Sequence, residues 1–287
     1  MTRRPSIGMV DRLAFGEVED MAYRMAANQA AMNHDRSVAM PEIRHITVHD
    51  LMDALSMGVR DFMAAPTQLL FLGLIYPIVG GLAAAAAAQN DLVPLLYPAL
   101  AGLSIMGPIA ALGMYELSRQ REMGVEITWR NALDVRSSGQ IMPIAWLGAM
   151  LLAVFLVWLG VAERIYIATL ASQPHDGIAS FINALISTRE GMMMFIIGNG
   201  VGFLFAMLVL TMTVVSFPML LDRRVGVLDA MVTSARAVWR NPVTMAVWGL
   251  MVAGLLLLGS LPLFVGLAVV MPILGHATWH LYRKLVA

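Results

Sequence analysis

Residues 53–66 read DALSMGVRDFMAAP, and residues 229–242 read DAMVTSARAVWRNP. A shift of 176 positions superposes the two, and Asp53, Arg60 and Pro66 then each meet an identical residue. Both stretches run directly into apolar sequence of membrane-spanning length. Because charged residues and proline coincide, and not only leucine and alanine, the pattern indicates a duplicated structural unit.

The ends of the following apolar segments match as well. A shift of 164 positions lays residues 108–119 over residues 272–283, and both stretches begin with Pro-Ile and end with Arg. A weaker middle copy places Gly124-Val125 on Gly226-Val227 at a shift of 102. The sequence therefore predicts three repeats, at about residues 47–121, 124–223 and 226–284.

Composition places the chain in a bilayer. Of its 287 residues, 59% are hydrophobic and only 13% are charged, about half the usual charged fraction of a soluble protein. The formal net charge is zero, which gives no reason to expect a nucleic-acid partner. Cysteine is absent, which excludes disulfides and thiolate chemistry. Residues 1–43 are polar and are expected to form a mobile extension without a cleavable signal, ahead of a membrane domain at 44–287.

Six segments have the length needed for a membrane-spanning helix. They lie at Gln68–Ala88, Leu92–Tyr115, Ile141–Ala162, Met192–Leu221, Val243–Ser260 and Leu261–Tyr282. None of them carries a charge in its middle, where insertion would cost about 2.5–3.5 kcal/mol. The predicted fold is therefore all-α and polytopic, with six transmembrane helices arranged as three hairpins, each preceded by an amphipathic interfacial helix.

Arginine placement predicts the orientation. Seventeen of the nineteen basic residues fall on one side of the six predicted spans, and only Arg164 and Arg189 fall on the other. By the positive-inside rule, both termini are expected in the cytoplasm of a bacterial cell, with the chain in its inner membrane. Residues 163–191 are expected to form one exoplasmic loop, with a short helix around Phe181 lying on the outer interface.

The stretches ahead of the hairpins show helical apolar stripes. In Thr47–Ala64, which Thr47 and Asp50 begin as a capping pair, the stripe contains Val48, Leu51, Met52, Leu55, Val59, Phe62 and Met63. In Val227–Arg240 it contains Leu228, Met231, Val232, Ala235, Val238 and Trp239, and the copy at Thr128–Ser138 is shorter. A helix with such a stripe can lie in the lipid headgroup layer, or its stripe can pack on the cytoplasmic ends of the protein's own spanning helices. The two arrangements are compatible. The residues expected to contact anionic lipid headgroups or a partner are Arg60, Arg236, Arg240 and Trp239.

Candidate catalytic chemistry is sparse. His45 with His49, and His276 with His280, each have the i, i+4 spacing that places two rings on one helix face. A metal site drawn from these four is the only candidate, and histidine at a membrane interface is a common polar end residue. No phosphate-binding loop, metalloprotease or serine-hydrolase motif occurs. We therefore predict no catalytic residue, no cofactor and no metal.

Three stretches resemble the signature regions of a known family. They are GPIAALGMYELSR at 107–119, FPMLLDR at 217–223 and PILGHATWHLYR at 272–283. They look like those of an uncharacterised bacterial family of predicted integral membrane proteins, a domain of unknown function, over about residues 44–286. Some members of that family are labelled cytochrome c oxidase subunit I. The resemblance implies a membrane location and says almost nothing about activity.

The oxidase label conflicts with the residues. A haem–copper catalytic subunit needs about twelve spanning helices and about six buried histidines, whereas this chain has half the helices and only His276 and His280 near a span. We therefore reject the role of a haem–copper catalytic subunit. An accessory or assembly role beside a respiratory membrane complex stays open. The preferred function is a non-catalytic scaffold, accessory or assembly protein. The alternatives are a small-solute or lipid transporter built from repeated hairpins, and a membrane enzyme acting on lipid.

Overall fold

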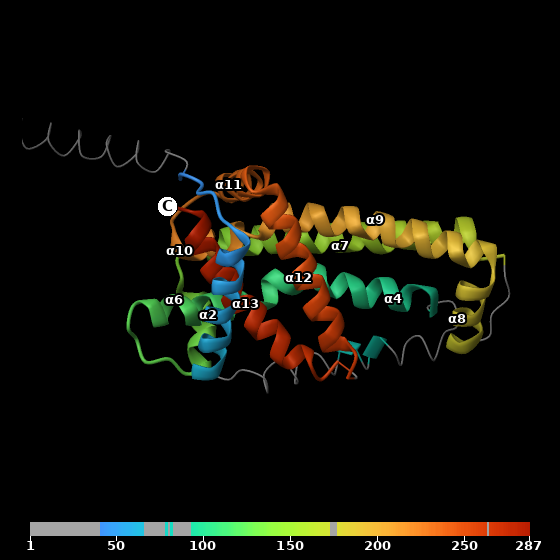
Figure 1. Cartoon of the computed structure of the whole chain (residues 1–287), viewed down its shortest axis with the longest axis horizontal. Helices are drawn as coiled ribbons and strands as arrows, with labels where there is room; N and C mark the ends of the chain where they lie inside the picture. Colours follow the sequence, from blue (N-terminus) through green and yellow to red (C-terminus); the bar gives the residue numbers. More distant parts are fainter. Residues whose placement is uncertain (1–40, 66–77, 80, 83–92, 173–176, 263) are drawn as a thin grey trace, which may run out of the picture. The chain divides into compact units, whose positions relative to one another are not determined.

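The computed structural model describes residues 41–65, 78–79, 81–82, 93–172, 177–262 and 264–287. Residues Glu42–Ala287 form one compact unit. Within the described residues the secondary structure is helical, apart from one isolated β-bridge between Ile43 and Val286. The helices (Figure 1) are α2 Val48–Ala64, α4 Val93–Gly102, η2 Leu103–Met106, α5 Gly107–Ala110, α6 Leu112–Glu122, η3 Trp129–Ser137, α7 Ile141–Thr169, α8 Ile178–Ser187, α9 Arg189–Thr213, α10 Ser216–Asp222, α11 Val227–Arg240, α12 Pro242–Ser260 and α13 Leu267–Leu285.

Four helical stretches are long and apolar enough to cross a membrane. They are Val93–Glu122, Ile141–Thr169, Arg189–Asp222 and Pro242–Ser260, and they correspond to the second to fifth predicted segments. The first predicted segment, Gln68–Ala88, lies almost wholly outside the described residues, as do most of residues 1–43. A membrane protein with several apolar helices is thus confirmed.

The sixth predicted segment, Leu261–Tyr282, differs in the structure. Its helix, α13, begins only at Leu267, after turns in which Phe264 has a φ of +65°. The second half of α13 is buried on nearly all sides and carries His276 and His280, so it is not one of the four apolar stretches. In Figure 1, α12 runs at a steep angle to α7 and α9, and the arrangement of six spans as three hairpins stays a prediction.

The predicted exoplasmic loop at 163–191 is shorter than expected. Helix α7 continues through Glu163 and Arg164 to Thr169, and α9 already begins at Arg189. The short helix predicted around Phe181 is present as α8, with the Phe181 ring buried. Helix α9 starts immediately because the Thr188 hydroxyl caps it, accepting a hydrogen bond from the Gly191 N–H at 2.9 Å.

Trp158 of α7 contacts both of the neighbouring apolar helices, α4 and α9. Its indole N–H donates to the Pro98 carbonyl of α4 at 2.9 Å, and its ring packs on Phe205 of α9 with centroids 5.4 Å apart. A Cβ at Gly202 of α9 would lie 3.1 Å from the same ring. One aromatic side chain on α7 therefore fixes the position of both neighbouring helices.

Helix α2 starts as predicted, with a reciprocal capping box. The Thr47 N–H donates to the Asp50 carboxylate at 2.8 Å, and the Asp50 N–H donates to the Thr47 hydroxyl at 3.4 Å. The middle amphipathic stretch begins with a similar box at Thr128 and Asn131, but it forms the 3-10 helix η3.

Burial on α2 does not follow the predicted stripe. Leu51 and Phe62 are buried, while Val48, Met52, Val59 and Met63 are exposed. The buried face of α2 instead contains small residues and one acid: Leu51, Ala54, Gly58, Asp61 and Phe62. This difference arises because the helix packs too closely on its neighbour for large side chains to lie between them.

Helix α13 packs closely against both α2 and α6. A Cβ on Gly58 of α2 would lie 2.7 Å from the Ala277 nitrogen and from the Ile273 carbonyl oxygen of α13. On the α6 side, a Cβ on Gly275 would lie 2.8 Å from the Met114 Cβ. These approaches are possible only with glycine, and they bring polar groups on the three helices within reach of one another.

We expect Gly58→Ala to lower the free energy of unfolding by about 1–3 kcal/mol, because the added methyl group meets backbone that cannot move aside. Gly254→Ala on α12 is the matched control, since its Cβ would enter open space and alanine gains about 0.5–1 kcal/mol in a helix. Thermal unfolding in detergent measures both. Equal melting temperatures for the two variants would contradict the close packing of α2 on α13.

Candidate functional site

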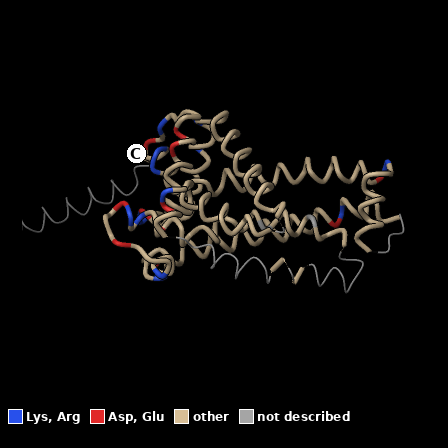
Figure 2. The backbone as a smooth tube through the Cα atoms, turned by 60° about the horizontal axis from the view of Figure 1, so that its bottom comes forward, with Lys and Arg blue, Asp and Glu red and all other residues tan. Residues whose placement is uncertain are grey.

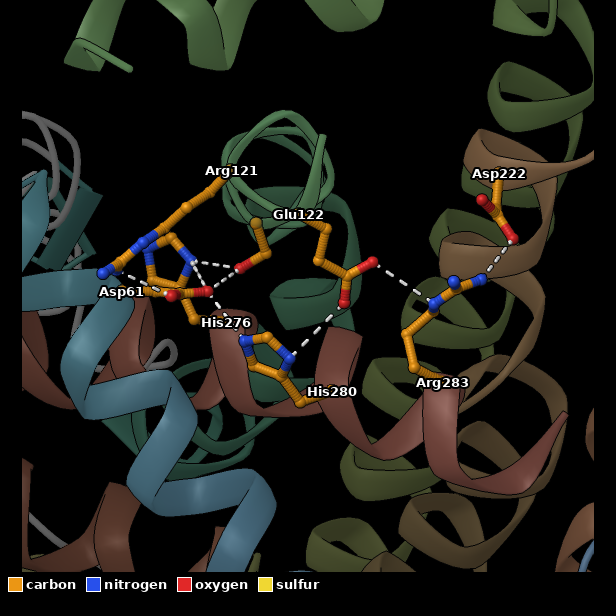
Figure 3. A network of polar contacts seen from close by, with 8 residues as sticks. Asp61, Arg121, Glu122, Asp222, His276, His280 and Arg283 are labelled. Carbon is orange, nitrogen blue, oxygen red and sulfur yellow. Dashed lines mark hydrogen bonds and ion pairs between the residues drawn. The ribbon is translucent and has the colours of Figure 1, made fainter. Parts of the chain in front are cut away.

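The buried polar residues of α2, α6 and α13 meet at one place. Asp61 lies on the buried face of α2, Arg121 comes from α6, and His276 and His280 come from α13 (Figure 3). Ser118 is a buried residue of α6. The i, i+4 spacing of the histidines directs both rings toward the same neighbours. We call this group, with Glu122, the Asp61 cluster.

Each oxygen of the Asp61 carboxylate has a donor. Oδ2 accepts the Ser118 hydroxyl at 2.5 Å and lies 2.7 Å from His280 Nε2, while Oδ1 accepts Arg121 at 2.8 Å. Asp61, Ser118 and both histidines are buried. Three hydrogen bonds to one carboxylate, two of them from groups that can carry positive charge, satisfy an ion removed from water.

Ser118 also contacts His276, whose Nδ1 lies 2.8 Å from the serine oxygen. Because the single hydroxyl hydrogen goes to Asp61, this contact is a hydrogen bond only if Nδ1 of His276 carries a hydrogen. In this row of four side chains, His276 then donates to Ser118, and Ser118 and His280 both donate to Asp61.

The cluster continues toward α10 through alternating charges. His280 Nδ1 lies 3.7 Å from Glu122 Oε1, and Arg283 contacts Glu122 at 3.3 Å and Asp222 of α10 at 3.4 Å (Figure 3). The Tyr282 hydroxyl donates to Asp222 at 2.6 Å. The polar contacts therefore connect α2, α6, α13 and α10 at one end of the described structure.

Electrostatics favour the ionised form of Asp61. Burial by itself raises the pKa of this carboxyl, but hydrogen bonds from His280 and Ser118 and the charge of His280 outweigh it. The resulting pKa of Asp61 lies below its ordinary value. At neutral pH the cluster therefore contains a carboxylate.

A pocket of about 190 Å³ opens over the Asp61 cluster. Its lining combines residues of the cluster with the rim of α2: Met57, Arg60, Asp61, Ser118, Arg121, Glu122 and His280. A larger pocket, of about 520 Å³, lies at the other end between α7 and α9 and is mainly apolar, with Arg164 at its edge.

The structure separates the four histidines proposed as metal ligands. His276 and His280 converge on Asp61, whereas His49 is exposed beside Asp53 at 3.4 Å and His45 is exposed. In the part of the chain that the structure describes, no group of three or more His, Asp or Glu side chains is arranged to hold a metal ion. The two pairs therefore do not combine into one site.

The predicted surface residues are all exposed. Arg60 lies on α2, and Arg236, Trp239 and Arg240 lie on α11. The Arg60 side chain contacts Ser56 at 3.4 Å, and its backbone carbonyl accepts a hydrogen bond from Arg121.

The sequence patterns did not indicate Asp61, Ser118, Arg121 or Glu122 as site residues. The signal for Asp61 was its register, since it falls three residues after Gly58 and seven after Ala54, on one face of the helix. The predicted stripe followed the larger apolar residues of α2, and most of these lie on the exposed side of the helix, opposite Asp61. Ser118, Arg121 and Glu122 had no comparable signal.

One comparison with known proteins gives a match. Residues 96–222 match the model of a family described as predicted integral membrane protein (DUF2189). This match confirms the resemblance to an uncharacterised membrane family, over a shorter region than the sequence stretches indicated. No curated protein and no solved structure matches the chain.

The DUF2189 match runs from α4 to α10. It contains Ser118, Arg121 and Glu122, but Asp61 and the two histidines lie outside it. The Asp61 cluster therefore joins the matched region to the helices that precede and follow it. The match gives no support to the cytochrome c oxidase label.

We expect Asp61→Asn to lower the free energy of unfolding by about 3 kcal/mol, because it removes the buried carboxylate that accepts hydrogen bonds from Ser118 and Arg121 and contacts His280. Asp53→Asn is the control. Its carboxylate is half-exposed and lies 3.4 Å from Lys284, so its loss is expected to cost less than about 1 kcal/mol. Unfolding measured in the same detergent compares the two, and equal losses would assign no special role to the cluster.

The low pKa of Asp61 also sets a pH window. A carboxyl whose pKa is lower in the folded protein stabilises the fold above its unfolded pKa of about 3.9 and loses that contribution as the pH falls further. The stability difference between wild type and Asp61→Asn should therefore stay constant from about pH 7 to pH 5 and shrink below about pH 4. A difference that instead changes between pH 7 and pH 5 would assign part of the effect to a histidine.

Proposed function

We propose that this chain is a non-catalytic scaffold or accessory protein of the bacterial inner membrane, with its Asp61 cluster on the cytoplasmic side. The observation that carries the proposal is the placement of charge. Figure 2 shows Lys, Arg, Asp and Glu gathered at the end that holds the C-terminus, with a smaller group at the other end. By the positive-inside rule, the end rich in arginine faces the cytoplasm.

The spanning stretches support a structural role. Their charged residues lie only in the terminal turns, such as Glu116 to Glu122 in the first and Glu163 and Arg164 in the second. A transporter coupled to ions is expected to carry an acid or base near the middle of the bilayer. The described spans contain none, and most of the charged residues lie at the cluster end.

The burial pattern supports the proposed repeat. Under the shift of 176 positions, Ala54 pairs with Ala230 and Gly58 with Ser234, and all four are buried. The pairs Met52–Leu228 and Met63–Trp239 are exposed in both helices. We infer that α2 and α11 are two copies of one amphipathic helix, of which only the first acquired the acid that builds the cluster, since Asp61 pairs with Ala237.

Photo-cross-linking in native membranes tests the scaffold proposal. A photoreactive residue replaces Met57 at the rim of the pocket, and the matched control replaces Leu204, an exposed residue in the middle of α9. We expect a discrete protein adduct from position 57 and lipid adducts from position 204. Lipid adducts alone at both positions, together with saturable solute flux into proteoliposomes of the purified chain, would favour a transporter and contradict the proposal.

A further inference from the structure

We propose that α2 and α11 lie in the headgroup layer of an anionic phospholipid leaflet, with one apolar face of each helix inserted among the acyl chains. This inference depends on the proposed function only for the side of the membrane. It rests on three observations: the faces the two helices expose, the arginines beside them, and their connection to spanning sequence.

Helix α11 exposes an apolar stripe opposite the face that it buries. Leu228, Val232 and Trp239 are 72%, 42% and 80% exposed, and with Ala235 they follow the 4, 3, 4 spacing of a single helix face. Small residues cover the opposite face, where Ala230, Ser234 and Ala237 are buried against the protein. A soluble helix shows the reverse arrangement, so this stripe needs an apolar environment outside the chain.

Helix α2 repeats the arrangement. Met52 and Met63 are 54% and 71% exposed, and Val48 and Val59 extend the same side of the helix. The opposite side packs on α13 through Ala54 and Gly58. Two helices far apart in the sequence therefore expose apolar side chains where an ordinary surface would be polar.

Arginines flank the stripes as an interfacial helix requires. On α11, Arg236 and Arg240 lie beside the stripe together with a single acid, Asp229, and on α2 Arg60 occupies the position equivalent to Arg236. Guanidinium groups at this level can contact lipid phosphates while the stripe remains among the acyl chains. Tryptophan at position 239 suits the same boundary, because its ring is preferred at the membrane–water interface.

The connection of α11 to a spanning stretch favours a bilayer over a protein partner as the surface that covers the apolar stripes. Helix α11 passes through Asn241 directly into α12, one of the four spanning stretches, whose second residue, Val243, is an exposed apolar side chain. The Asn241 side chain also holds the segment ahead of α2, binding the Ile46 N–H at 2.9 Å and the Arg44 carbonyl at 3.1 Å. Both amphipathic helices are thus fixed at the level where the chain enters the membrane.

Spin labelling tests this depth, and the absence of cysteine makes single labels clean. Val232→Cys, Trp239→Cys and Met63→Cys carry a nitroxide in the purified full-length chain, reconstituted in vesicles of phosphatidylethanolamine and phosphatidylglycerol. Leu204→Cys is the control for the acyl-chain region and Glu42→Cys the control for water. Each labelled protein is used only if its melting temperature equals that of the wild type, which these exposed positions favour.

We expect the three labels to collide with dissolved oxygen more, and with a water-soluble nickel chelate less, than the label at position 42. Their depth should lie between those of positions 42 and 204. In the Trp239→Cys background, Arg236→Gln with Arg240→Gln should move the label toward water in vesicles containing phosphatidylglycerol, and not in vesicles of phosphatidylcholine alone.

Labels as accessible to the nickel chelate as position 42 would overturn the proposal and leave the stripes as a surface for a protein. An equal response to the arginine substitutions in both kinds of vesicle would overturn its anionic component. Because the assay contains no partner protein, its outcome is independent of the cross-linking result for the scaffold proposal.

Discussion

A carboxylate that leaves water must be supplied with hydrogen-bond donors, and Asp61 obtains all of its donors from two other helices. Ser118 and Arg121 reach it from α6, and His280 reaches it from α13. These contacts require the three helix backbones to approach closely. The approach is provided by Gly58 on α2, which meets the backbone of α13, and by Gly275 on α13, which meets the Met114 side chain of α6. Close packing and polar satisfaction thus depend on each other, because losing either would leave a buried charge unpaired.

This constraint explains why α13 differs from an ordinary membrane helix. Its second half is covered by α2 and α6, and it carries histidines where a spanning helix would carry apolar residues. The same packing sets which face of α2 is buried: its small residues face α13, and Met52 and Met63 face outward. An exposed apolar stripe is therefore a direct result of the close contact that the Asp61 cluster needs.

Several features could be predicted from the sequence because they depend on local chemistry or on long apolar runs. The cap at Thr47 and Asp50, the segments that became α7, α9 and α12, and the short helix α8 are of this kind. The cluster could not be predicted, since it depends on which face of α2 meets α13 and on a contact across 219 positions between Asp61 and His280. The i, i+4 histidine pair indicated one side of the site, but its partners lie on helices that no sequence pattern connects.

The cluster, helices α2 and α11 and the start of α12 all lie at the arginine-rich end of the described chain. On our account the cluster fixes α2 and α13 to each other, and that pairing sets how both amphipathic helices face the bilayer. A double-mutant cycle between Asp61→Asn and His280→Gln measures this link most directly. We predict that the two losses in free energy of unfolding at neutral pH are non-additive by about 1 kcal/mol or more, as expected for residues in contact. Additive losses would show that Asp61 and His280 act separately and would contradict the account.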